Sequence, residues 1–209
     1  MVQKIIKYFL ILLFFGLLLY NAVYFKKISE MQVLKIETVF DAKAYAKTYL
    51  LEKIPAAKKE AVAVADLLSA MKKDSKKAFT AFSHFQNEGD MKYFFVKGEG
   101  KVTAIDEEFV TLKIASGTEI KLAIQYIFGN TSRDCSGLIS IDDFSNTMDL
   151  NNVSEEINKL IKSEIVAPFK TKVQKGDRIS FLGGIELSQS NPKTDKIEIV
   201  PLQLEINSK

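Results

Sequence analysis

The spacing of hydrophobic and polar positions changes twice along the chain. An uncharged apolar run fills residues 8–25 and has no polar face. From residue 30 to residue 85, apolar residues recur at the three- and four-residue spacing of amphipathic helices, and from Met91 onward they alternate with polar residues, as in strands. The pattern therefore predicts three regions: an N-terminal membrane anchor at 1–29, a helical region at 30–90 and a β domain at 91–207.

The apolar run is predicted to be an uncleaved single-pass anchor in the cytoplasmic membrane. The basic segment MVQKIIK precedes it, and Ile5 and Ile6 extend it to the length of about 20 residues that spans a hydrocarbon core. A cleavable signal peptide would have a shorter apolar core and a small-residue cleavage site after it, which this sequence lacks. Lysines flank both ends, so charge does not set the orientation. A short N-terminal tail before a large domain favours placing that domain in the periplasm.

Five strands are predicted in the β domain, and a helix interrupts them. An amphipathic stripe from Val153 to Ile165 forms that helix, with Ser154 as its expected N-cap. Three strands, a helix and two strands are typical of the OB-fold, a five-stranded Greek-key barrel. An open sheet covered by one helix is the alternative that periodicity leaves open. The alternating patterns of the five strands cover 92–105, 109–115, 119–128, 176–188 and 196–207.

The predicted fold class is therefore α+β. It consists of an N-terminal transmembrane helix, a short helical region, and a five-stranded OB-like Greek-key β-barrel with one helix between strands 3 and 4. Asp41 and Asp74 are the expected N-caps in the helical region, and Pro55 is expected to break the first helix or to open the next one. A shift of the apolar phase at Val200–Pro201 predicts a bulge on an edge strand. Sharp strand bends are expected at four glycines: Gly98, Gly100, Gly183 and Gly184.

Composition argues against several classes of function. The chain has 29 basic and 26 acidic residues, and only Arg133 and Arg178 are arginines. No basic stripe is visible, and the outward positions of the second and third predicted strands carry mixed charge and one aromatic residue, which argues against nucleic-acid binding. One histidine and one cysteine cannot build the usual metal sites or an internal disulfide. We therefore expect neither a metal nor another cofactor.

The candidate chemistry gathers in GNTSRDCSGLISIDDFSN, residues 129–146, which holds an arginine, the single cysteine and three aspartates. In a ligand cradle, the planar fork of Arg133 would bind a carboxylate, a phosphate or a pair of sugar hydroxyls. In a structural motif, Arg133 would pair with Asp143 or Asp134 and fix the crossover to the barrel, with Phe144 as an apolar plug. The candidate residues for either role are Gly129, Arg133, Asp134, Asp143, Phe144 and Asn146.

Several motifs together resemble a known family. They are VKGEGKV at 96–102, GNTSRD at 129–134, the Asp-Phe-x-Asn at 143–146 and the closing GDRISFLG at 176–183. Over residues 30–207 the chain resembles the uncharacterised bacterial family of predicted periplasmic lipoproteins, domain-of-unknown-function family 2291. The positions that match its motifs are Gly98, Gly100, Gly129, Arg133, Asp134, Asp143, Phe144 and Asn146.

The resemblance implies an OB-like barrel, export to the periplasm and an association with sugar ABC transport systems, and it assigns no catalytic residue. This chain departs from the family at two points. It has no cysteine near the N-terminus for lipid attachment, so a membrane-spanning anchor would replace the lipid. It also has Thr147 where the family usually has glutamine after the asparagine, which leaves a polar role for that position open.

The leading hypothesis is a non-enzymatic, membrane-anchored accessory or binding protein of the periplasm. Its expected partners are the cytoplasmic membrane and either ABC transporter subunits or a small carbohydrate, and the transporter link follows from the resemblance alone. A membrane-tethered hydrolase that uses the Asp134/Asp143 region is an alternative of a different class, because paired carboxylates can serve as acid and base. A third hypothesis is an envelope assembly scaffold whose helices bind a membrane partner.

Overall fold

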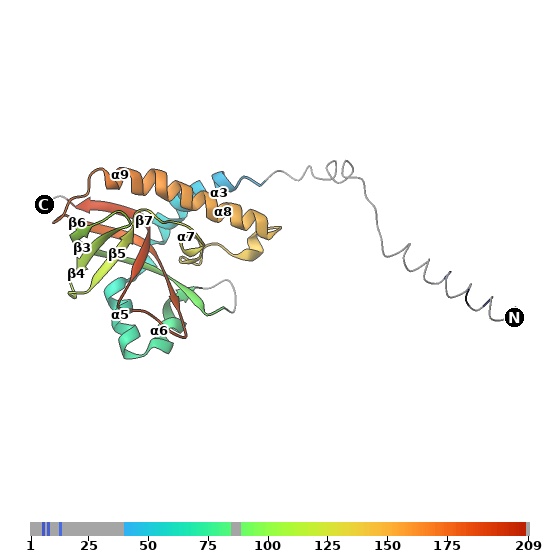
Figure 1. Cartoon of the computed structure of the whole chain (residues 1–209), viewed down its shortest axis with the longest axis horizontal. Coiled ribbons are helices and arrows are strands. Elements are labelled where there is room, and N and C mark those ends of the chain that lie inside the picture. Colours follow the sequence, from blue (N-terminus) through green and yellow to red (C-terminus); the bar gives the residue numbers. More distant parts are fainter. Residues whose placement is uncertain (1–5, 7, 9–12, 14–39, 85–88, 208–209) are drawn as a thin grey trace. The chain divides into compact units, whose positions relative to one another are not determined.

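Five strands close into a barrel in the computed structural model, which describes residues 6, 8, 13, 40–84 and 89–207 (Figure 1). The three strands between Met91 and Ala123 form an antiparallel meander. The last described strand of the chain runs parallel to the third of these and antiparallel to the strand that precedes it, and that preceding strand closes the barrel against the first one. This arrangement is that of the OB-fold, so the predicted Greek-key barrel is confirmed. The strands are β3 (Met91–Ile105), β4 (Phe109–Ile114), β5 (Glu119–Ala123), β6 (Arg178–Ser188) and β7 (Glu198–Asn207).

Alternation along the strands fills the barrel interior. Val110, Leu112 and Ile114 of β4 are buried, as are Ile120 and Leu122 of β5, and polar or partly exposed residues separate them. A residue every second position points to one face of a strand, so this pattern places the branched side chains together inside the barrel. The predicted alternation thus gives the observed inward faces of β4 and β5.

The bulge predicted at Val200–Pro201 is present. The register between β6 and β7 shifts between Leu182 and Gly183, where Gly183 pairs with Pro201 and Leu182 pairs with Gln203. A Cβ atom on Gly183 would lie 2.5 Å from the carbonyl oxygen of Val200, so the close approach requires a glycine here. The predicted edge position holds for only part of β7, because Glu198 and Ile199 also pair with β5.

The region predicted as purely helical contains strands as well. β1 (Val62–Ala63) pairs parallel with β3, and β2 (Ser83–His84) pairs antiparallel with it. Asp41 and Asp74 cap helices as expected, since each carboxylate accepts a backbone N–H three residues later. The helices are α3 (Ala42–Thr48), η1 (Tyr49–Lys53), α4 (Ile54–Ala56), η2 (Ala57–Lys59), α5 (Val64–Lys73) and α6 (Ser75–Phe82).

The connection between β5 and β6 contains more than the single predicted helix. The main helix begins at Thr147, because the Asn146 side chain accepts the N–H of Asp149 at 2.9 Å and caps it. Ser154, the expected cap, therefore lies inside the helix. The elements are α7 (Thr131–Asp134), η3 (Ile141–Asp143), α8 (Thr147–Leu160), η4 (Ile161–Val166) and α9 (Ala167–Lys170).

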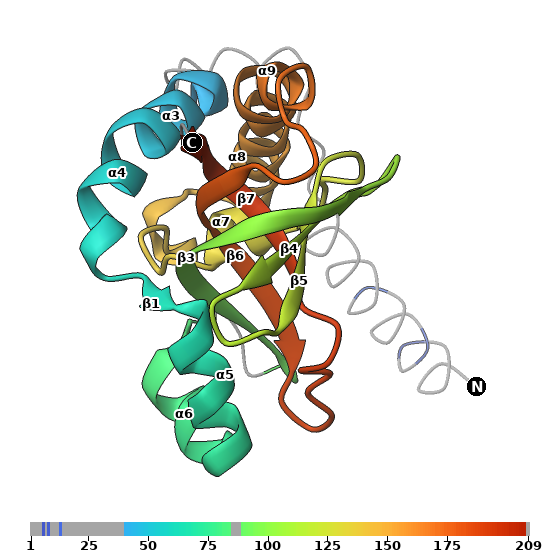
Figure 2. The same cartoon turned by 90° about the vertical axis from the view of Figure 1, so that its left-hand side faces the viewer.

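Asp41–Lys209 form one compact unit, in which the short helices and the barrel pack together (Figure 2). α3 packs against α8, and α5 and α6 contact β3. The predicted anchor at 1–29 lies almost entirely outside the described residues. Among those that are described, no helix is both long and apolar enough to cross a membrane. The anchor and the boundaries at residues 29 and 90 stay predictions.

We predict that Gly184→Ala destabilises the fold by about 1–3 kcal/mol, the usual cost of overpacking a filled core. A Cβ atom there would lie 2.8 Å from the Cβ and Sγ atoms of Cys135 and 3.0 Å from the Thr131 carbonyl oxygen. Gly89→Ala is the matched control, because its Cβ would meet no atom within 4 Å. Urea unfolding of the full chain in detergent, followed by circular dichroism, measures both. Equal stability of the two variants would contradict the prediction.

Candidate functional site

Six consecutive residues of the crossover, Thr131–Ser136, are buried although five of them are polar or charged. Their exposed fractions lie between 0% and 6%. Burying a polar group is costly unless it is hydrogen-bonded. Within the described part of the chain, no buried side-chain nitrogen or oxygen lacks a hydrogen-bond partner. The segment is therefore a polar core with internally satisfied side chains.

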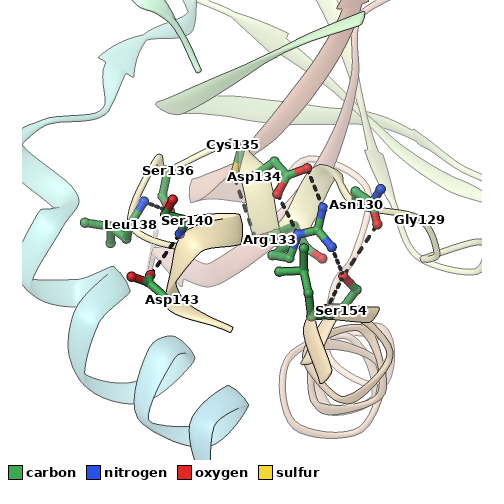
Figure 3. Close-up of polar contacts among 12 residues, drawn as sticks. Gly129, Asn130, Arg133, Asp134, Cys135, Ser136, Leu138, Ser140, Asp143 and Ser154 are labelled. Atoms are coloured by element: carbon green, nitrogen blue, oxygen red, sulfur yellow. Dashed lines mark hydrogen bonds and ion pairs between the residues drawn. The ribbon is translucent and has the colours of Figure 1, made fainter. Parts of the chain in front are cut away.

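Arg133 and Asp134 form a bidentate ion pair in the middle of this segment (Figure 3). Arg133 Nε donates to Asp134 Oδ1 at 2.6 Å, and Nη2 donates to Oδ2 at 2.9 Å. The remaining guanidinium nitrogen, Nη1, donates to Ser154 Oγ of α8 at 2.8 Å. All three nitrogens of the guanidinium and both carboxylate oxygens are thus engaged within the protein. Paired, hydrogen-bonded charges are the form in which an arginine is tolerated in a core.

The neighbours of the ion pair fasten α7 to α8 and to the barrel. Ser132 Oγ donates to Asn158 Oδ1 at 2.6 Å, and Asn158 Nδ2 donates to the Gly129 carbonyl at 2.9 Å. On the other side, Thr131 Oγ1 donates to Glu186 Oε2 of β6 at 2.7 Å. These bonds join residues 26 to 55 positions apart in sequence, so the crossover is tied to two distant elements.

Tyr49 of η1 connects the same segment to the N-terminal helices. Its hydroxyl lies 2.9 Å from the Ser132 carbonyl and 2.9 Å from Ser136 Oγ, and the side chain is fully buried. Burial raises the pKa of Tyr49 well above its usual value, and the neighbouring Cys135 adds to the effect. The hydroxyl therefore stays protonated and acts as a hydrogen-bond donor to the crossover.

Cys135 is a buried thiol packed against the barrel. Its exposed fraction is 0%, and Gly184 of β6 provides the space for its side chain. Burial, followed by the nearby Asp134 carboxylate, raises the pKa of Cys135 far above that of a free thiol. Because the thiolate is the reactive form, this environment makes the cysteine a packing residue and a poor nucleophile.

The structure separates the predicted candidate residues into two groups. Arg133 and Asp134 belong to the polar core. Gly129 is exposed beside it, adopts a positive φ of 76° and accepts a hydrogen bond from Asn158 through its carbonyl. Of the two predicted partners of Arg133, Asp134 is the one that the structure shows. The alternative, Asp143, was wrong: its Oδ2 atom accepts the Ser140 N–H at 3.0 Å in a capping box, away from Arg133 in Figure 3. Phe144 packs on Tyr45 with ring centroids 5.4 Å apart, and Asn146 caps α8.

This geometry gives the motif no pair of facing, unpaired carboxylates, because Asp134 is bonded to Arg133. Both oxygens of Asp134 are occupied by Arg133, and Asp143 is exposed in a separate turn. The hydrolase alternative required these two carboxylates to face a common space, and it receives no support from their placement. The ligand cradle likewise requires a free guanidinium, whereas that of Arg133 is buried and each of its three nitrogens donates to a group within the protein.

A groove elsewhere on the domain is large enough for a ligand. It has a volume of about 830 Å³, within the range typical of binding pockets. The C-terminal half of β7, residues 202–206, forms its floor. One wall comes from α3, η1 and α4, and the other comes from the end of α8 through η4 and α9. In Figure 2 the end of β7 lies between α3 and α9.

Sequence reasoning missed this groove and the partners of the ion pair. Tyr49 and Asn158 were not singled out in the sequence, and Ser154 was expected to cap a helix, whereas it accepts a hydrogen bond from Arg133. The one available signal was the presence of a serine and an asparagine, Ser154 and Asn158, four residues apart and interleaved with the apolar stripe of α8. The groove offers no motif, because it is built from ordinary leucines, prolines and lysines.

The fold and the site define a single OB-fold domain with N-terminal helices and a buried polar crossover. Among solved structures, an OB-fold protein from Thermotoga maritima matches with a TM-score of 0.72 and 24% sequence identity, over 80% of this chain and 99% of that chain. This likeness confirms the fold. Comparison with curated proteins gives no significant match.

Residues 13–205 match the model of the family described as predicted periplasmic lipoprotein (DUF2291), and the chain belongs to this family. The resemblance found from the motifs is therefore confirmed. The family assignment also supports the predicted membrane-associated location in the periplasm.

We predict that Arg133→Met destabilises the protein by about 3–5 kcal/mol, because it leaves the Asp134 carboxylate buried without a partner. The double variant Arg133→Met with Asp134→Leu should recover much of that loss, since it removes both charges. Lys77→Met, which breaks the exposed pair with Asp74 at 3.5 Å, should change stability by less than about 1 kcal/mol. Urea unfolding of the full chain measures the free energy of unfolding of each variant. A stable Arg133→Met protein would show that the pair is dispensable to the fold.

Proposed function

We propose that the protein is a membrane-anchored accessory module of the periplasm that acts by binding a partner protein. The observation that carries this proposal is the groove of about 830 Å³ over the end of β7. Its position is separate from the Arg133 motif, whose polar groups are already satisfied within the fold. Binding requires only a complementary surface, which the groove provides, whereas catalysis requires reactive groups that the motif does not offer.

The composition of the groove favours a protein partner over a small carbohydrate. More than half of its lining residues are apolar, and they include the exposed Leu51 and the partly exposed Ile165. Protein interfaces have an apolar centre with a polar rim. Sugar hydroxyls need convergent hydrogen-bonding groups, and Gln203 is the only amide side chain that lines this groove among the described residues.

The partner that we propose is a subunit of a sugar ABC transport system. This part of the proposal rests on the family resemblance, which links such proteins to sugar uptake. A single-pass anchor over residues 5–25 would hold the domain at the membrane surface, where transporter subunits are accessible. The scaffold hypothesis differs only in the partner, and the same surface would serve it.

Topology is tested by protease treatment of intact spheroplasts. We expect added protease to digest the domain, because the proposed orientation places residues after the anchor outside the cytoplasmic membrane. A cytoplasmic protein in the same preparation should stay intact as the control for membrane integrity. A domain that is cut only after lysis would contradict the proposed orientation.

The partner is tested by photo-cross-linking in living cells. A photoreactive amino acid at Leu51, which is 61% exposed in the groove, should give an adduct with a transporter membrane subunit. The same amino acid at Phe128, which is 72% exposed and outside the groove, is the control and should not give that adduct. Mass spectrometry identifies the adducts. Recovery of no transporter subunit from Leu51, or equal recovery from both positions, would contradict the proposal.

A further inference from the structure

The C-terminal half of β7 has a partner strand on one side only. β7 pairs with β5 only at Glu198 and Ile199, whereas its pairing with β6 continues to Asn207. Among the described residues, no other strand pairs with β7. The stretch after the bulge therefore presents a row of backbone N–H and C=O groups that lack a strand partner. Such an edge is a template for the addition of another strand.

This free edge runs along the floor of the groove. Successive residues of a strand point to opposite faces, and the groove contacts all five residues from Leu202 to Ile206. Contact with both faces means that the groove approaches the strand from its edge. Pro201, which would obstruct pairing, lies before this stretch, and the bulge leaves only Leu202 at its start without a partner in β6, so Gln203 to Ile206 form a regular strand.

The two walls of the groove are mainly apolar, and they differ in the charged residues that they carry. On the α3 side the lining residues are Leu50, Leu51 and Pro55 together with two lysines, Lys43 and Lys47. Neither lysine forms an ion pair within the part of the chain that the structure describes. The opposite wall carries one glutamate and one lysine, Glu164 and Lys172, and the floor carries Glu205. The α3 wall is therefore the basic side of the groove.

We propose that the groove binds an extended segment of a partner polypeptide, which adds as a strand to the free edge of β7 and directs an acidic side chain toward Lys43 and Lys47. The inference rests on the proposed function and names the class of its ligand. Backbone hydrogen bonds to β7 supply affinity that depends little on sequence, and the two walls select the side chains. A lipid acyl chain would fill the apolar walls but would leave the edge of β7 without hydrogen-bond partners.

The test uses the full chain in detergent and a fluorescent octapeptide of alternating valine and threonine with a glutamate at each end. Two further versions carry N-methyl groups on alternate amides. One version is methylated at the odd-numbered positions and the other at the even-numbered positions, and each set of positions is called a frame. An added strand points one frame of N–H groups at β7 and the other frame away from it. We expect one version to bind more than about tenfold more weakly than the parent peptide and the other to bind comparably, because only one loses several inter-strand hydrogen bonds.

Groove variants and matched controls locate the binding. Leu51→Asp and Lys47→Glu should each weaken the parent peptide several-fold, whereas Phe128→Asp and Lys76→Glu, which alter residues outside the groove, should not. Circular dichroism confirms that each variant is folded. Lys47→Glu should also bind a version of the peptide with lysines in place of its glutamates more tightly than the unsubstituted chain does.

Three outcomes would overturn the inference. Equal binding of both methylated versions would exclude strand addition. Displacement of the peptide by oleate together with equal binding of both versions would identify the groove as an acyl-chain site. Absence of peptide binding, combined with transporter adducts at Leu51 in cells, would leave the proposed function intact and show that the groove recognises a folded surface.

Discussion

The buried Arg133–Asp134 pair determines how the residues around it are arranged. Two charged groups that are removed from water need hydrogen-bond partners within the protein. The desolvation of an ion is repaid only by close, well-directed partners. Adjacent residues on one turn of α7 supply the bidentate bonds, and Ser154 supplies the third. The surrounding segment must then place its own backbone and hydroxyl groups so that none is left unsatisfied. A short, fully buried helix is the result.

Meeting that requirement joins three parts of the domain that are distant in sequence. Ser154 and Asn158 of α8 form hydrogen bonds with the crossover, and Thr131 of the crossover forms one with β6. Tyr49 of η1, more than 80 residues away in sequence, donates a hydrogen bond to the crossover as well. Once η1 and α8 are both held against α7, α3 packs along α8. The walls of the groove are therefore positioned by the polar core, although no residue of α7 lines the groove. The unusual residues of the crossover therefore determine where the groove walls lie without lining the groove themselves.

The sequence predicted the barrel well because its strands have one buried face, and alternation records that face directly. The roles of Asn146 and Asp134 were harder to predict from the sequence. A capping asparagine and a ligand-binding asparagine have the same local sequence, and only the position of the helix start separates them. The choice between Asp134 and Asp143 as partner of Arg133 depended on the turn at Ser140–Asp143, where Asp143 is used in a local capping box. The hydrophobic periodicity of the sequence does not show whether a side chain bonds to a local or to a distant partner, so this choice could not be predicted.

The groove was unpredictable for a related reason. Leu51 and Lys47 have no distinguishing context in the sequence, and β7 reads as a continuous strand whose second partner is lost only after Ile199. Pairing on one side of a strand depends on the topology of the barrel, in which β5 pairs with β7 only at Glu198 and Ile199 while β6 pairs along most of β7. A surface that combines an unpaired strand edge with apolar walls arises from topology, and ordinary residues suffice to build it. The stretch richest in unusual residues therefore organises the fold, whereas the groove is built elsewhere on the domain from ordinary residues.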